Sequence, residues 1–189
     1  MGKPFPLYTY SFIPLNKKCL NYIQSINYMQ SAESKILILG MGNDILTDDG
    51  IGIKITKVLE NKFPLPNIVY NTLSIGGMEI IEYIKNFDTV IIIDAIKTLN
   101  GIPGTVYRFV PSDFKETTHL SNIHDLSFLT ALKLAKELDI KTPENIYIIA
   151  IEIVEDMVFS SDFTPQLQEK YSEILEEVSI IVKELVDKK

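Results

Sequence analysis

The sequence predicts an α/β fold in which helices cover both faces of a largely parallel sheet. Two observations support this prediction. Short apolar runs typical of buried strands alternate with longer segments in which apolar residues recur at helical spacing, and turns rich in glycine or proline separate them. The chain has 189 residues, 46% of them hydrophobic and 23% charged, so it can bury a substantial core and wholesale disorder is excluded.

In the first part of this pattern, three predicted strands alternate with two helices. Residues 35–40, KILILG, form the first strand, and residues 48–63 form a helix because apolar residues recur at i, i+4, i+7 and i+8. Residues 67–73, NIVYNTL, are the second strand, and a short helix is expected over residues 76–87 after a double glycine. The third strand, TVIIIDAI at 89–96, is apolar enough to be buried on both faces.

The second part of the chain continues the alternation. Residues 105–110, TVYRFV, alternate in polarity and are expected near an edge of the sheet. A helix is predicted over residues 124–140, with an apolar face formed by Leu126, Leu129, Leu132, Leu134 and Leu138. Residues 145–153, NIYIIAIEI, form another buried strand. The final helix begins after a threonine N-cap with proline at its first position and covers residues 164–186.

The N-terminal 34 residues differ from the rest because they show no clear period and hold four of the nine tyrosines. They are either an extension that packs on the domain or sequence upstream of the native start. We favour the second interpretation, because Met29 lies six residues before KILILGMGN. The predicted organisation is therefore an N-terminal extension, residues 1–34, and a single α/β domain, residues 35–189.

Charge and cysteine content narrow the partners and the compartment. The formal net charge is -7 and no run of lysine or arginine exceeds two residues, so a nucleic-acid partner is not expected. Cys19 is the only cysteine, which excludes an internal disulfide and fits a reducing cytoplasm. No apolar stretch approaches the ~20 residues that span a bilayer, and no secretory signal is recognisable. We therefore expect a cytoplasmic protein without a membrane partner.

The segment GMGNDILTDDGIG, residues 40–52, has the position of a nucleotide-binding loop between a strand and a helix. Gly40 and Gly42 fit the first two positions of the dinucleotide fingerprint, but Ile45 stands where the third glycine is required. The loop carries three aspartates and no lysine, and these carboxylates would repel a bound pyrophosphate. The loop is therefore predicted to present a carboxylate to a positive group.

Three candidate site residues lie where strands lead into loops or helices. Asp49 follows the first strand, Asp94 closes the run TVIIID, and His124 begins the helix HDLSFLTALKL. Ligands of open parallel sheets bind at the carboxyl ends of the strands, so the three side chains can converge there. Two carboxylates and an imidazole suit divalent Zn, Ni, Mn or Fe. The same groups can act without a metal as a general base and an electrostatic clamp.

Structural roles are the alternatives for these residues. Asp48 and Asp49 can cap the helix that follows them, where carboxylates are favourable. Asp94 follows a run of β-branched residues and needs a partner, water or a ligand to offset its desolvation. His124 can stabilise its own helix, and His119 lies in a polar loop typical of a solvated side chain.

Six segments, taken in order, resemble the hydrogenase maturation endopeptidases. They are KILILGMGNDILTDDGIGIKI, GGMEII, DTVIIIDAI, GIPGTV, HDLSFLTAL and FTPQLQEKY. That family removes a C-terminal tail from the large subunit of [NiFe] hydrogenases. The resemblance runs from about residue 35 to near the C-terminus. It implies a three-layer α/β/α sandwich around a largely parallel, twisted five-stranded sheet, and it implies an aspartic-type endopeptidase that acts on a large-subunit precursor.

The resemblance also implies roles for single residues. The metal-contacting residues of the family match Asp49, Asp94 and His124. The resemblance implies that Asp49 and Asp94 are the catalytic carboxylates, without assigning a role to each. It implies that Asp48 is a capping or supporting residue. The metal is nickel that arrives with the substrate, so no stored cofactor is required. The family turn G-G-T-x-G reads SIGGMEI here, so its threonine is absent.

Two alternatives to this function stay open. One is a non-catalytic protein of the same fold that binds a metal or assists hydrogenase assembly as a chaperone. The other is a peptidase for a different substrate. The sequence does not assign the nucleophile or the general base.

Overall fold

The computed structural model describes residues 35–74, 79–113 and 123–188, although the side chains of residues 123–127 are not part of that description. The predicted N-terminal extension, the double glycine at 76–77 and His119 lie outside the described residues. The division of the chain at residue 34 therefore stays a prediction.

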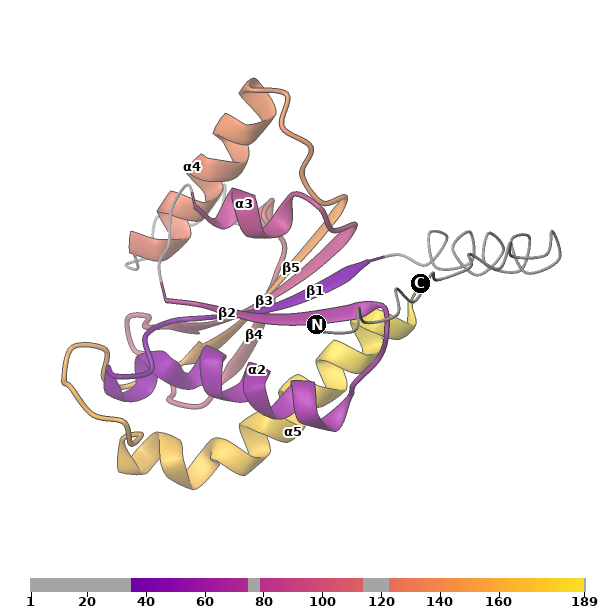
Figure 1. The fold of residues 1–189 in the computed structure, drawn as a ribbon. Helices are drawn as coiled ribbons and strands as arrows, with labels where there is room; N and C mark the ends of the chain where they lie inside the picture. The colour runs from indigo at the N-terminus through magenta and orange to yellow at the C-terminus, as the bar shows by residue number, and fades with distance from the viewer. Residues whose placement is uncertain (1–34, 75–78, 114–122, 189) are drawn as a thin grey trace, which may run out of the picture. The chain divides into compact units, whose positions relative to one another are not determined.

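The described residues contain a mixed sheet in the strand order β2-β1-β3-β5-β4, shown in Figure 1. The strands are β1 (Ile36–Met41), β2 (Ile68–Leu73), β3 (Thr89–Ile96), β4 (Val106–Phe109) and β5 (Asn145–Glu152). Neighbours among β2, β1, β3 and β5 pair in parallel, and β4 pairs antiparallel with β5 at the edge. The predicted largely parallel sheet and the edge position of TVYRFV are confirmed.

Helices cover both faces of this sheet, which confirms the three-layer prediction (Figure 1). They are η1 (Thr47–Gly50), α2 (Ile51–Lys62), α3 (Ile80–Ile84), α4 (Ile123–Glu137) and α5 (Pro165–Asp187). One face packs against α2 and α5, and the other packs against α3 and α4. No helix in the described part of the chain combines the length and the apolar character needed to cross a membrane.

The two cores explain why β3 is so apolar. All eight of its residues are buried, as the sequence predicts for a central parallel strand. Ile91 and Ile93 belong to the core beneath α2 and α5, whereas Val90 and Ile92 belong to the core beneath α3 and α4. Successive side chains of a strand point to opposite faces, so β3 supplies both cores.

The predicted leucine face of α4 is partly wrong. Among the described side chains of α4, Phe128, Ala131 and Ala135 are buried in the core, and the predicted Leu129 and Leu132 are partly buried against it. Leu138 is 59% exposed, because α4 ends at Glu137 and the chain then turns through Asp139 at a φ of 54°. Helical periodicity alone did not identify where the helix stops. The short helix α3 is likewise shorter than the predicted segment 76–87.

Candidate functional site

A small cavity of about 100 Å³ lies where β1, β2 and β3 approach their carboxyl ends. It is lined by Met41, Gly42, Asn43, Leu46, Asp49, Leu73, Ser74 and Asp94. The two aspartates that the sequence singles out thus face one cavity although they are far apart in the chain. Parallel strands expose their carboxyl ends on one edge, which is where ligands of open α/β sheets bind.

Asp49 is held in η1 by the turn that precedes it. The backbone N–H of Asn43 donates to Oδ2 of Asp49 at 2.7 Å, and this bond orients the carboxylate. Gly42 adopts a φ of 124°, and a Cβ at this position would overlap the backbone carbonyl of Asp49. The glycine of the opening loop therefore serves a close backbone approach that brings Asp49 to the cavity.

A second close approach brings Asp49 toward β3. Gly52 is the second residue of α2, and a Cβ here would overlap the carbonyl oxygens of Ile93 and Met41. The first turn of α2 consequently packs directly on the ends of two strands. Because η1 leads into α2, this contact sets the carboxylate of Asp49 beside the segment that carries Asp94.

Asp94 lies inside β3 rather than at its end, because the strand continues to Ile96. The residue is 9% exposed, and its Oδ1 accepts a hydrogen bond from the N–H of Ala95 at 2.8 Å. The alternation of the strand puts Asp94 on the same face as Ile92, whose core lies beneath α3 and α4. The cavity is therefore on the face of the sheet that α4 covers.

His124 lies in the first turn of α4, the helix that packs on this same face. Its side chain lies outside the described residues, so its distance from Asp49 and Asp94 is not part of the structure. Within the described residues, no group of three or more histidine, cysteine, aspartate or glutamate side chains is arranged to hold a metal ion. The ligand set of two carboxylates and one imidazole stays a prediction.

Asp48 has a different environment from its neighbour, because it is fully buried. Its Oδ1 accepts from the N–H of Thr164 at 2.7 Å, and its Oδ2 accepts from the hydroxyl of Thr164 at 2.9 Å. Its Oδ2 also accepts from the N–H groups of Val154 and Glu155, each at 3.2 Å. Asp48 thus ties η1 to the loop after β5 and to the start of α5.

The capping alternative for Asp48 is wrong for the helix that follows it. The N-cap of α2 is Gly50, and no side-chain hydrogen bond caps that helix. The hydroxyl of Thr164, the predicted N-cap of α5, is likewise directed at Asp48 instead of capping its own helix. The charge of Asp48 is satisfied by donors from more than 100 residues away in the chain.

Glu152 is a buried carboxylate that the sequence analysis missed. It ends β5 at 1% exposure and accepts from the N–H and the hydroxyl of Thr98 at 2.7 and 2.9 Å. A Cβ at Gly101 would overlap this carboxylate, so the loop after β3 wraps closely around it. Burial, followed by the negative charge of Glu152, raises the pKa of Tyr107. The available signal was a lone acid within the apolar run NIYIIAIEI.

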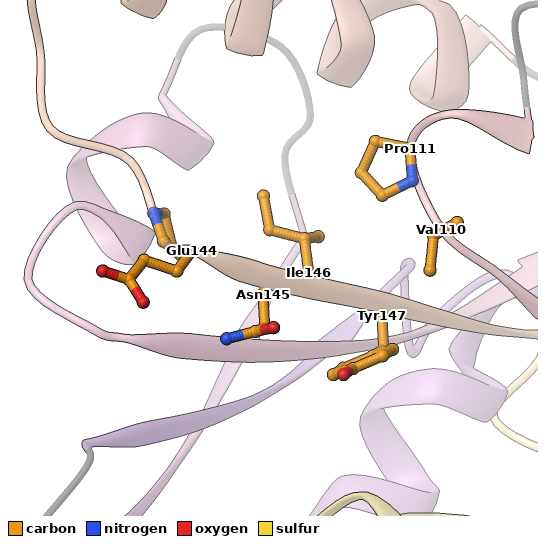
Figure 2. Close-up of a pocket in the computed structure, with 7 residues that line it drawn as sticks. Val110, Pro111, Glu144, Asn145, Ile146 and Tyr147 are labelled. Atoms are coloured by element: carbon orange, nitrogen blue, oxygen red, sulfur yellow. The ribbon is translucent and has the colours of Figure 1, made fainter.

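A second cavity lies at the opposite end of β5, as Figure 2 shows. It has a volume of about 260 Å³ and is lined by Val110, Pro111, Pro143, Glu144, Asn145, Ile146 and Tyr147. Glu144 is the one carboxylate among these lining residues. This cavity therefore lacks the pair of carboxylates that lines the cavity at the carboxyl edge.

Comparisons with known proteins agree with this fold and identify the family. The family model for hydrogenase maturation proteases matches residues 74–181. The Hydrogenase 2 maturation protease of Escherichia coli strain K12 is 32% identical over 158 residues, which span 79% of this chain and 92% of that protein.

Solved structures give the same result. The hydrogenase maturating endopeptidase HybD from E. coli superposes with a TM-score of 0.62 at 29% identity, covering 79% of this chain and 93% of that one. The [NiFe] hydrogenase maturation protease HybD from Thermococcus kodakarensis gives a TM-score of 0.61 at 26% identity, covering 80% and 99%. The chain therefore belongs to the hydrogenase maturation protease family, whose members hydrolyse peptide bonds.

Proposed function

We propose that this peptidase removes the C-terminal extension of a [NiFe] hydrogenase large-subunit precursor after nickel has been inserted, and that it recognises the nickel bound to that substrate. The observation that carries the proposal is the cavity at the carboxyl edge, which both Asp49 and Asp94 line. The names of the related proteins, which include a [NiFe] hydrogenase maturation protease, support this substrate class.

The chemistry of the cavity fits a cation that arrives with a peptide. Two carboxylates favour a positive centre, and an imidazole from His124 would add a neutral nitrogen ligand. A metal ion held here would polarise the scissile carbonyl, and one of the two carboxylates would activate water as a general base. The proposal does not assign which of Asp49 and Asp94 is the general base.

The size of the cavity supports a small occupant. At about 100 Å³ it admits a metal ion with part of a peptide group, but not a folded segment. In this proposal the scissile peptide group and the nickel beside it are the parts that enter. A single cysteine in the whole chain favours a reducing compartment such as the cytoplasm for this reaction.

The direct test incubates the purified protein with a large-subunit precursor, once loaded with nickel and once without metal. The proposal predicts a loss of mass equal to the C-terminal extension, only with the nickel-loaded precursor. Binding of either precursor without any loss of mass would favour a chaperone instead. Cleavage that is equally fast without nickel would favour a peptidase with a different recognition signal.

The role of His124 has its own test with a matched control. His124→Ala should reduce processing of the nickel-loaded precursor by roughly 10²-fold or more, because an imidazole ligand and its orientation are lost. His119→Ala removes the other histidine of the chain and should process the precursor at the wild-type rate. Equal rates for both variants would remove His124 from the proposed ligand set.

A further inference from the structure

Four large apolar side chains are exposed on two loops at the carboxyl edge of the sheet. Met157 and Phe159 are each 78% exposed, Val158 is 55% exposed and Ile45 is 54% exposed. Single exposed apolar residues are common, whereas large apolar patches mark interaction sites. We call Ile45, Met157, Val158 and Phe159 together the apolar rim.

Backbone hydrogen bonds join the two loops that carry the apolar rim. The N–H of Ser160 donates to the carbonyl of Ile45 at 3.0 Å, and the N–H of Thr47 donates to the carbonyl of Ser160 at 2.9 Å. Leu46 and Ser160 thereby form a parallel bridge. Ile45 and Phe159 each come one residue before this bridge, so they are neighbours in its register.

Hydrogen bonds hold the segment that follows Ile45 against the loop that carries the rest of the rim. Thr47 has a φ of 42°, an unfavourable conformation for a β-branched residue, and its hydroxyl donates to the carbonyl of Val158 at 2.5 Å. Asp48 holds the same loop through the N–H groups of Val154 and Glu155. Ordering this loop in advance lowers the entropy lost when a partner is bound.

The rim adjoins the candidate site. Leu46 lines the cavity that contains Asp49 and Asp94, and it is the residue between Ile45 and Thr47. The cavity is too small to supply the contact area of a specific protein complex. An occupant that matches both features presents an apolar surface next to a positive centre, since the cavity offers two carboxylates.

We propose that the apolar rim is a docking surface for the folded body of the substrate protein, which binds there while its nickel and the neighbouring scissile peptide enter the cavity. This inference rests on the proposed function. Buried apolar anchors supply most of the affinity of protein interfaces, whereas the cavity supplies the chemistry. The rim should therefore control affinity for the precursor and leave the rate of the bound complex unchanged.

The test is the variant Met157→Ser/Phe159→Ser, with Phe159→Ser alone as a milder change. Ile180→Ser is the matched control, because Ile180 is 52% exposed on α5 and lies outside the rim. Affinity for a nickel-loaded large-subunit precursor is measured by calorimetry, and kcat and KM are measured by the loss of mass. The double variant should raise Kd and KM by about tenfold or more with an unchanged kcat and Tm. The control should match the wild type.

The calorimetric measurement tests docking separately from cleavage. If the wild type binds the precursor through the rim but does not cleave it, the proposed function fails and the docking surface stands. If the wild type cleaves the precursor and the double variant has an unchanged Kd, the docking proposal is overturned and the function stands. Loss of enzyme self-association in the double variant, with unchanged precursor affinity, would assign the rim to a second copy of this chain and overturn the proposal. Absence of precursor binding by the wild type overturns both.

Discussion

The carboxyl edge of the sheet holds two pairs of carboxylates in contrasting environments. Asp49 and Asp94 line a cavity, whereas Asp48 and Glu152 are buried at 0% and 1% exposure. Asp48 accepts hydrogen bonds from Val154, from Glu155 and twice from Thr164, and Glu152 accepts two from Thr98. The first pair faces a cavity, and the second pair holds loops in position.

Residue type and position in the sequence therefore do not by themselves determine whether an acidic side chain is structural or lines a site. Asp48 and Asp49 are adjacent, yet one faces protein donors and the other faces a cavity. Asp48 and Glu152 are almost fully buried and line no cavity with Asp49, and several hydrogen-bond donors offset their desolvation, which indicates a structural role. A carboxylate that lines a cavity can instead exchange water for a substrate-borne cation.

The largest expected effect separates the two neighbours by activity. Asp49→Asn should lower processing of a nickel-loaded precursor by roughly 10²–10⁴-fold, because the ligand charge and the potential base are lost. The Tm should stay within a few degrees of the wild type, as measured by calorimetry. Asp139→Asn, an exposed acid after α4, is the control and should keep full activity. A fully active Asp49→Asn enzyme would show that Asp49 is not needed for processing.

The adjacent substitution should act on stability instead. Asp48→Asn puts an amide donor where Val154, Glu155 and Thr164 already donate, so at least one buried donor is left unpaired. The free energy of unfolding should fall by about 2–4 kcal/mol. This corresponds to a Tm lower by roughly 5–15 °C. An unchanged denaturation midpoint would show that these hydrogen bonds do not stabilise the fold.

Glu152 should show a smaller effect of the same kind. Glu152→Gln keeps one acceptor for the two donors of Thr98 and weakens bonds that are assisted by charge. We expect the free energy of unfolding to fall by about 1–2 kcal/mol, with kcat for the precursor unchanged. Denaturant titration and turnover measured on the same sample will decide. A loss of kcat without a loss of unfolding free energy would show that Glu152 takes part in the reaction rather than in holding the fold.

The smallest effect is expected at alkaline pH. Burial, then Glu152, raises the pKa of Tyr107 above its ordinary value of 10.0. Because the folded pKa is the higher one, the stabilisation is complete below pH 10.0 and is lost as the pH rises toward the folded pKa. Tyr107→Phe should therefore flatten the decline of unfolding free energy in that range. Identical declines in the two proteins would contradict the assigned environment.

Much of the fold was predictable because its elements are locally encoded. The strands β1, β3 and β5 are apolar runs, and the alternating polarity of β4 predicted its position at the edge of the sheet. Ligands bind at the carboxyl ends of parallel strands, and this rule predicted from the sequence that Asp49 and Asp94 lie close together. Their shared cavity is a finding, whereas their function and the position of the His124 side chain remain predictions.

The rest depended on contacts between distant parts of the chain. Asp48 was interpreted through its nearest helix, but its partners lie 106 to 116 residues away. The partner of Glu152 is 54 residues away, and the bridge between Leu46 and Ser160 joins loops that no local pattern relates. Burial and long-range hydrogen bonds of this kind leave no periodic signal in a single sequence.

The most direct test of the central claim is the processing of a nickel-loaded large-subunit precursor by the double variant Asp94→Asn/His124→Ala. We expect this variant to fold, with a far-ultraviolet circular dichroism spectrum like that of the wild type. We expect the precursor to keep its full mass. Cleavage at the wild-type rate would contradict the account, because the reaction would then not depend on the carboxylate and imidazole assigned to the carboxyl edge.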